Sequence, residues 1–176
     1  LPVKPYAASL FDFGDDTGLG SGLLRSRAKT PAGQQAEEVA DWERFTAYLK
    51  TVYRTPDELA RSWAVPATSF AAVSRATVST EQAKKNMVPL LDYRQYQEYL
   101  YGEHLKTMRA LARKEIPDAR TTINGYGDIG KNMEIVAGAV DSLVPYYRPN
   151  DLRKIRGILG REKSLGIVTG AYYGDE

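Results

Sequence analysis

The sequence predicts an α/β fold built from parallel βα units. Short apolar stretches typical of strands alternate along the chain with longer amphipathic stretches typical of helices. Strands that alternate with helices pair in parallel, because each helix returns the chain to the start of the next strand. The 176 residues suffice for one domain, whereas a closed eight-stranded α/β barrel takes about 250 residues. We therefore expect a parallel sheet with fewer strands than a whole barrel.

The first predicted strand covers residues 6–13 and runs directly into a glycine-rich loop over 14–22. Four of the nine residues in that loop are glycine. Glycine is costly in regular elements and is frequent in tight turns, so no helix or strand is expected there.

Two helices and an irregular stretch are predicted next. Residues 34–54 carry apolar side chains at three- and four-residue spacing, which is typical of one helix face. Thr55, Pro56 and Glu58 form a capping-box pattern that begins a second, short helix. Residues 65–91 have no clean periodicity, and we expect an irregular excursion there.

The second half of the chain alternates in shorter periods. It is predicted to contain a helix over 92–115 capped by Asp92, strands over 119–124, 141–147 and 165–173, and helices over 131–139 and 150–159. With the first strand, this makes four parallel strands in chain order.

Composition argues against several classes of function. The net charge is only +2, from 24 basic and 22 acidic side chains, so neither a nucleic-acid nor a membrane-surface partner is expected. No run of about 18 apolar residues is present to span a membrane. Cysteine is absent, which excludes thiol-based sites. His104 is the single histidine, and we expect no metal and no cofactor. Localisation stays open between secreted and cytoplasmic.

Polar and aromatic side chains follow each predicted strand. In parallel α/β folds the active site collects at these carboxyl ends. Carboxylates and amides bond to hydroxyl groups, and aromatic rings stack on sugar rings, so this set favours carboxylate chemistry on a neutral polyol. The set comprises Asp15 and Asp16 just after the first strand, Asn124 at the end of the second with Tyr126 beyond it, Tyr147 at the end of the third, and Tyr173 at the end of the fourth with Glu176 beyond it.

The order of these pieces resembles a known enzyme family. Gly14-Asp15-Asp16 closes a strand, and the stretch from Trp42 to Trp63 with Thr55-Pro56-Asp57-Glu58-Leu59 follows it. Asp92-Tyr93, a long helix and the strand Thr121-Thr122-Ile123-Asn124 come next. Over most of residues 6–147, this order is similar to that of the family 42 glycoside hydrolases, the β-galactosidase-like TIM barrels.

The resemblance implies that residues 1–176 are one segment of a TIM (β/α)8 barrel, with the four strands matching barrel strands four to seven. The remainder of the barrel, or a partner chain, would close the sheet. The implied activity is hydrolysis of β-galactoside-like or related glycosidic bonds in a carbohydrate substrate. Asp16 takes the acid/base position, normally a glutamate in the family, and Glu176 is the candidate nucleophile. The candidate substrate-binding residues are Asp15, Asn124, Tyr126, Tyr147 and Tyr173.

Other interpretations of the same residues remain open. Asp15 and Asp16 are also typical of turns, where aspartate bonds to its own backbone. Asp12, Asp15 and Asp16 together would suit a divalent cation. Asn124 also fits an ordinary turn at a strand end. Because aspartate is one methylene shorter than glutamate, the chain is alternatively a non-catalytic carbohydrate-binding or scaffold segment.

Overall fold

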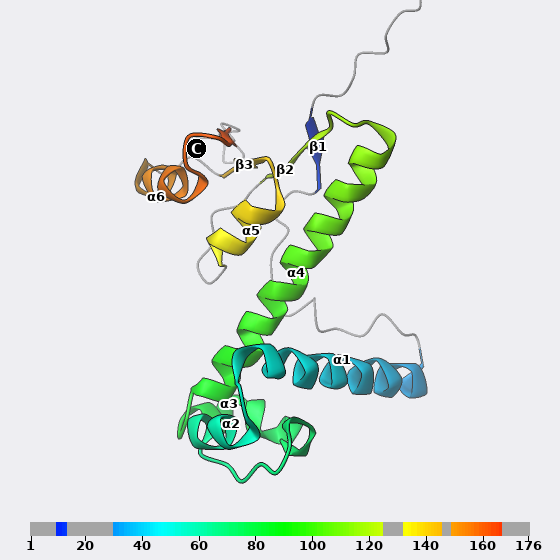
Figure 1. The fold of residues 1–176 in the computed structure, drawn as a ribbon, viewed down its shortest axis with the longest axis vertical. Coiled ribbons are helices and arrows are strands. Elements are labelled where there is room, and N and C mark those ends of the chain that lie inside the picture. The colour runs from blue at the N-terminus through cyan, green and yellow to red at the C-terminus, as the bar shows by residue number, and fades with distance from the viewer. Residues whose placement is uncertain (1–9, 14–29, 125–131, 146–148, 167–176) are drawn as a thin grey trace, which may run out of the picture. The chain divides into compact units, whose positions relative to one another are not determined.

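The computed structural model describes residues 10–13, 30–124, 132–145 and 149–166 (Figure 1). Predictions on the remaining residues, including the glycine-rich loop over 14–22, lie outside the described residues. The chain divides into two compact units, one of residues 1–19 and 98–176 and the other of residues 20–97. Helix α4 (Val88–Glu115) contributes its first ten residues to the second unit and the rest to the first.

The first unit contains a parallel sheet with four described strands in the order β1-β2-β3-β4. The predicted α/β class and the parallel pairing are therefore confirmed. Sequential order follows from the βαβ connections, which place each new strand beside the previous one. The strands are β1 (Leu10–Asp12), β2 (Arg120–Asn124), β3 (Ser142–Val144) and β4 (Ser164–Leu165).

The strand register separates an apolar from a polar face of the sheet. Paired residues of neighbouring strands point the same way, and successive residues alternate. Ile123 is paired with Leu143, both are fully buried, and both belong to the core cluster. That cluster also contains residues of α4, α5 (Met133–Ala139) and α6 (Pro149–Leu159), so these three helices cover one face. The opposite face carries the paired residues Thr122 and Ser142.

Asp141 attaches helix α4 to the beginning of the sheet. Its carboxylate forms ion pairs with Arg109 and, at 3.0 Å, with Arg113, both on α4. The second carboxylate oxygen accepts from the Thr121 N–H at 3.0 Å and from its hydroxyl at 3.1 Å. The two arginines thus meet the amino ends of the strands, the edge opposite to the predicted site.

The second unit is helical, as predicted. Helix α1 (Pro31–Val52) begins a few residues earlier than expected, because Thr30 caps it by accepting from the Gly33 N–H at 3.2 Å. Helix α2 (Pro56–Trp63) begins at the predicted capping pattern, with the Thr55 hydroxyl accepting from the Glu58 N–H at 3.2 Å. The expected irregular stretch holds η1 (Phe70–Ala72), η2 (Arg75–Val78) and α3 (Thr80–Ala83).

The predicted capping role of Asp92 is wrong. Helix α4 begins at Val88, whose N–H donates to the Asn86 side chain at 3.0 Å. Pro89 is compatible with this earlier start, because a first-turn residue needs no intrahelical N–H donor. Asp92 is instead buried within the helix, where it accepts hydrogen bonds from the side chains of Tyr53 and Trp63.

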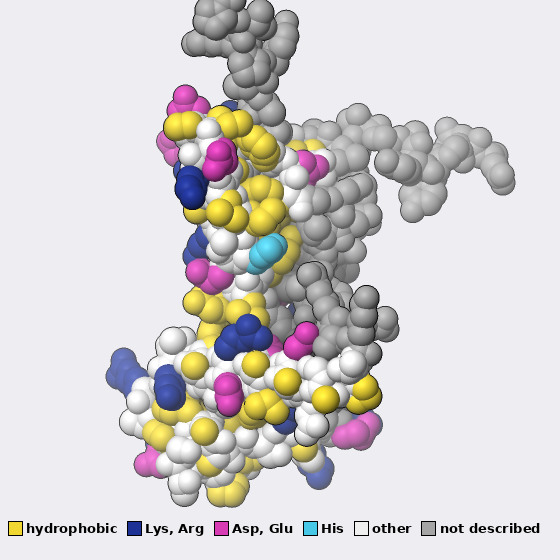
Figure 2. All heavy atoms as spheres, turned by 90° about the vertical axis from the view of Figure 1, so that its right-hand side faces the viewer, with side chains coloured by type: hydrophobic (Ala, Val, Ile, Leu, Met, Phe, Trp, Pro, Cys, Tyr) yellow, Lys and Arg dark blue, Asp and Glu magenta, His cyan; other side chains and the backbone are white. Residues whose placement is uncertain are grey.

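Two surface features complete the fold. His104 is exposed, and it is the cyan side chain at the surface in Figure 2. Large hydrophobic side chains are also exposed, among them Val39 on α1 and Leu111 on α4. No helix in the described ranges is both long and apolar enough to cross a membrane.

Candidate active site at the carboxyl ends of the strands

Asp12 and Asn124 meet at the carboxyl end of the sheet. Asp12 is the last residue of β1, and Asn124 is the last residue of β2. The register pairs Asp12 with Thr122, so Asp12, Thr122 and Asn124 share the polar face. The Asn124 side-chain amide donates a hydrogen bond to the Asp12 carboxylate. The structure therefore brings the predicted amide beside a carboxylate that the sequence had placed only in a possible cation site.

The polar face continues toward the amino ends of the strands. The Thr122 hydroxyl donates to the Ser142 carbonyl at 3.1 Å, and both residues are buried. Two residues before Thr122 on strand β2, the Arg120 guanidinium donates to the Ser164 hydroxyl of β4 at 2.5 Å. Because β3 lies between those strands, the Arg120 side chain crosses it on this face. Polar contacts thus run along the face and end at Asp12 and Asn124.

Six of the predicted site residues lie outside the described residues. They are Asp15, Asp16, Tyr126, Tyr147, Tyr173 and Glu176. Their roles stay predictions, and so does the cation alternative that uses Asp15 and Asp16. Among the described residues, no three histidine, cysteine or acidic side chains gather into a possible metal site.

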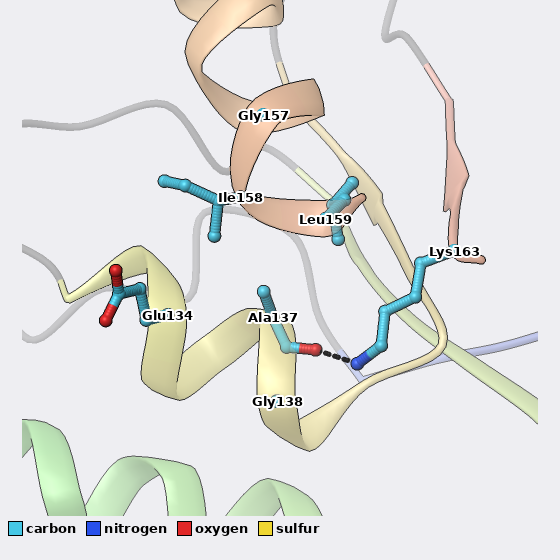
Figure 3. A pocket seen from close by; sticks show the side chains of 7 residues that line it. All are labelled: Glu134, Ala137, Gly138, Gly157, Ile158, Leu159 and Lys163. Carbon is cyan, nitrogen blue, oxygen red and sulfur yellow. Dashed lines mark hydrogen bonds between the residues drawn. The ribbon is translucent and has the colours of Figure 1, made fainter. Parts of the chain in front are cut away.

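An open pocket of about 440 Å³ lies between α5 and α6 (Figure 3). Lys163 lines it and donates to the backbone carbonyls of Ala137 and, at 2.9 Å, Val140. These carbonyls belong to the C-terminal end of α5, where a cation is favourable. Burial, together with the charge of Arg109, lowers the pKa of Lys163. This lysine precedes β4, so the pocket is near the amino ends of the strands, away from Asp12 and Asn124.

The second unit contains two carboxylates whose role as hydrogen-bond acceptors the sequence did not predict. Asp92 accepts from the Tyr53 hydroxyl at 2.5 Å and from the Trp63 indole N–H at 2.7 Å. Asp41 accepts from the hydroxyls of Tyr93 and Tyr96 at 2.8 and 3.1 Å. The abundance of tyrosine in the sequence points to such acceptors indirectly, because a buried tyrosine hydroxyl needs a hydrogen-bond partner.

Burial is the main cause of the tyrosine pKa shifts in this unit. Burial, together with the hydrogen bond to Asp92, raises the pKa of Tyr53 to about 12. Burial and Asp41 also raise the pKa of Tyr93 and of Tyr96. All three side chains therefore stay neutral donors at ordinary pH, which indicates a structural role for this network.

Comparisons with known proteins point to agarases, which are glycoside hydrolases. By sequence, the chain is 30% identical over 95 residues to β-agarase B of Vibrio sp. (strain JT0107). The match includes 54% of this chain but only 10% of that relative's length. The sequence similarity supports a relationship to glycoside hydrolases and does not single out family 42.

The chain is also similar in structure to the agarase AgWH50C. That crystal structure matches with a TM-score of 0.49 and 21% identity, over 68% of this chain and 18% of the agarase. No protein-family model matches the chain.

Proposed function

We propose that this chain is a segment of a glycoside hydrolase that cleaves β-galactoside-like or related bonds in a neutral polysaccharide, agarose being the first candidate. The observation that carries the proposal is the 30% identity to β-agarase B over 95 residues. The polar carboxyl end of the sheet agrees with it, because Asp12 and Asn124 offer hydrogen bonds to hydroxyl groups there.

The proposed architecture is four consecutive strands, numbers four to seven, of a (β/α)8 barrel. A doubly wound sheet carries helices on both faces and changes strand order at a switch point. In this chain the described strands keep sequential order, and the core cluster joins α4, α5 and α6 to a single face. An outer ring of helices and an inner face of side chains is the barrel arrangement. The rest of the barrel, or a partner chain, would close the sheet.

The proposed mechanism uses two carboxyl groups. Asp16 acts as the acid/base, and Glu176 is the candidate nucleophile. In retaining enzymes the two groups lie about 5–5.5 Å apart, and in inverting enzymes about 6.5–9.5 Å apart. The acid must hold its proton near neutral pH, and the like charge of the adjacent Asp15 would favour this. Tyr126, Tyr147 and Tyr173 would contact the sugar beside Asp15 and Asn124.

A non-catalytic carbohydrate-binding segment is the second candidate function. It is favoured by one observation, the aspartate at position 16, where the resembled family has a longer glutamate. Both functions require that the protein binds the carbohydrate, but only the hydrolase would also cleave it.

The test is hydrolysis by the full-length protein of agarose and of a panel of nitrophenyl glycosides. The enzyme proposal expects turnover that Asp16→Asn lowers by several orders of magnitude, with carbohydrate binding retained. Asp118→Asn is the matched control. Asp118 is an exposed carboxylate that precedes the amino end of β2, whereas the candidate site is at the carboxyl end. Binding without turnover would support the second candidate, and turnover that Asp16→Asn leaves intact would refute the acid/base assignment.

A further inference from the structure

We propose that Asp12 is a positioning residue, which holds the Asn124 amide in the orientation that recognises a sugar hydroxyl. This inference rests on the proposed function and adds to it a residue of the same site. The observation behind it is the hydrogen bond from the Asn124 Nδ2 to the Asp12 carboxylate at the carboxyl end of the sheet.

The strand register explains why these two side chains meet. Asp12 lies beside Thr122, and Asn124 is two residues further along the same strand, so all three point to the polar face. The hydrogen bond therefore runs diagonally from the end of β2 to the end of β1. The contact joins residues 112 positions apart in the sequence, so it exists only because β1 and β2 are neighbours.

The sheet itself does not require this contact. The ladder between β1 and β2 continues past Asp12, because the Phe13 N–H donates to the Thr122 carbonyl at 3.0 Å. Asp12 is exposed and Asn124 is half-buried, and neither belongs to the core cluster on the opposite face. A side-chain pair at this edge is thus placed to contact a ligand rather than to stabilise the interior.

The hydrogen-bonding groups of the pair fit a neutral polyol. A primary amide has two N–H donors and one carbonyl acceptor. When one N–H donates to Asp12, a donor and an acceptor remain on the same rigid group, which matches a hydroxyl that both donates and accepts. Fixing the rotamer of Asn124 before binding also lowers the entropy lost when the sugar binds. A cation bound between Asp12 and Asn124 would instead require the amide oxygen of Asn124, and not its N–H, to face the Asp12 carboxylate.

The test is a double-mutant cycle in the full-length protein, with Asp12→Ala, Asn124→Ala and both together. Each single substitution is expected to lower kcat/KM by about tenfold, the effect of one lost charge-assisted hydrogen bond. The double variant should be little worse than either single one, because both remove the same oriented amide. Asp12→Asn retains a carbonyl that accepts from Asn124, so it should restore most of the activity. Asp118→Ala is the control for loss of an exposed carboxylate.

A second measurement separates recognition from folding. With monodeoxy nitrophenyl glycosides, the wild type should lose kcat/KM on removal of one particular hydroxyl, whereas Asn124→Ala should show no further loss for that analogue. Thermal unfolding of all variants reports any structural damage. Suppose that the wild type turns over the parent glycosides. If the two single substitutions leave kcat/KM unchanged, or if the loss in the double variant is the product of the two single losses, the positioning role is wrong and the proposed function stands. If the wild type neither binds nor hydrolyses carbohydrate, both fail together.

Discussion

At the scale of the residue, three aspartates connect elements that are distant in the sequence. Asp92 joins α4 to Tyr53 and Trp63, and Asp41 joins α1 to two tyrosines of α4. Asp141 joins the end of α4 to β2. A carboxylate removed from water is costly unless its oxygens accept hydrogen bonds. Asp92 is buried and Asp41 and Asp141 are half-buried, so each aspartate depends on its donors.

Asp92→Ala should lower the free energy of unfolding by about 3 kcal/mol, because the Tyr53 hydroxyl and the Trp63 indole N–H both lose their acceptor. Both donors bind the same carboxylate oxygen. Asp92→Asn keeps one oxygen there and should cost less than half as much. Urea unfolding measures both effects, and Gln95→Ala, at an exposed position of the same helix, is the control. Equal losses for Asp92→Ala and Gln95→Ala would contradict the role of this network.

The raised pKa of Tyr53 predicts a loss of stability in alkaline solution. Tyrosine in an unfolded chain has a pKa of about 10, whereas burial and Asp92 raise the pKa of Tyr53 to about 12 in the fold. Between these values the folded state binds more protons, so the free energy of unfolding falls as pH rises. The slope should be shallower in Tyr53→Phe, as followed by urea unfolding across this range. An unchanged slope would show that Tyr53 titrates normally.

At the scale of the element, two glycines inside helices differ in the space around them. A Cβ on Gly102 of α4 would overlap the Cγ2 methyl of Ile135, so this glycine permits α5 to pack closely. Gly157 of α6 has no neighbouring atom within 4 Å of its would-be Cβ. Helix propensity favours alanine over glycine by about 1 kcal/mol at either position. Packing alone therefore distinguishes the two.

Gly102→Ala should destabilise the protein by about 1–2 kcal/mol, because overpacking outweighs the gain in helix propensity. Gly157→Ala should stabilise it by up to about 1 kcal/mol. Chemical unfolding of the two variants beside the wild type is the measurement, and each serves as the control of the other. Changes of the same sign would mean that the contact between Gly102 and Ile135 does not limit packing.

At the scale of the whole molecule, the chain consists of two compact units with separate polar networks. Asp141 and its arginines lie in the unit that contains the sheet, and Asp92 with its donors lies in the helical unit. The two networks share no partner among the described residues. Substitutions in them should therefore act locally.

Hydrogen exchange measured by mass spectrometry tests this division. Asp141→Ala should increase exchange in β2 and α5 by about tenfold or more, with little change in α1 and α2. Asp92→Ala should show the reverse pattern. Exchange that rises uniformly along the chain in both variants would indicate a single cooperative body instead.

Local patterns predicted the elements well where a cap and a periodicity agreed. Thr55 and Pro56 mark the beginning of α2 exactly as the capping pattern indicates. The prediction failed at Asp92, where an aspartate before apolar residues has the local appearance of a cap but is used as a buried acceptor. For the site, Asn124 was named correctly as a strand-end residue, whereas its partner was not, since no local pattern joins it to Asp12.

The sequence by itself determined the alternation of strands and helices, their parallel pairing and the residues that follow the strands. The alternation depends on periodicity and capping, which act over a few neighbouring residues, and the parallel pairing follows from the alternation itself. Only the tertiary structure decided which face of the sheet is polar, why Asp92 is buried and that Asp12 contacts Asn124. Those outcomes depend on contacts between residues that are far apart in the sequence, 39 positions for Tyr53 and Asp92 and 112 positions for Asp12 and Asn124. Such contacts form only when packing brings distant segments together.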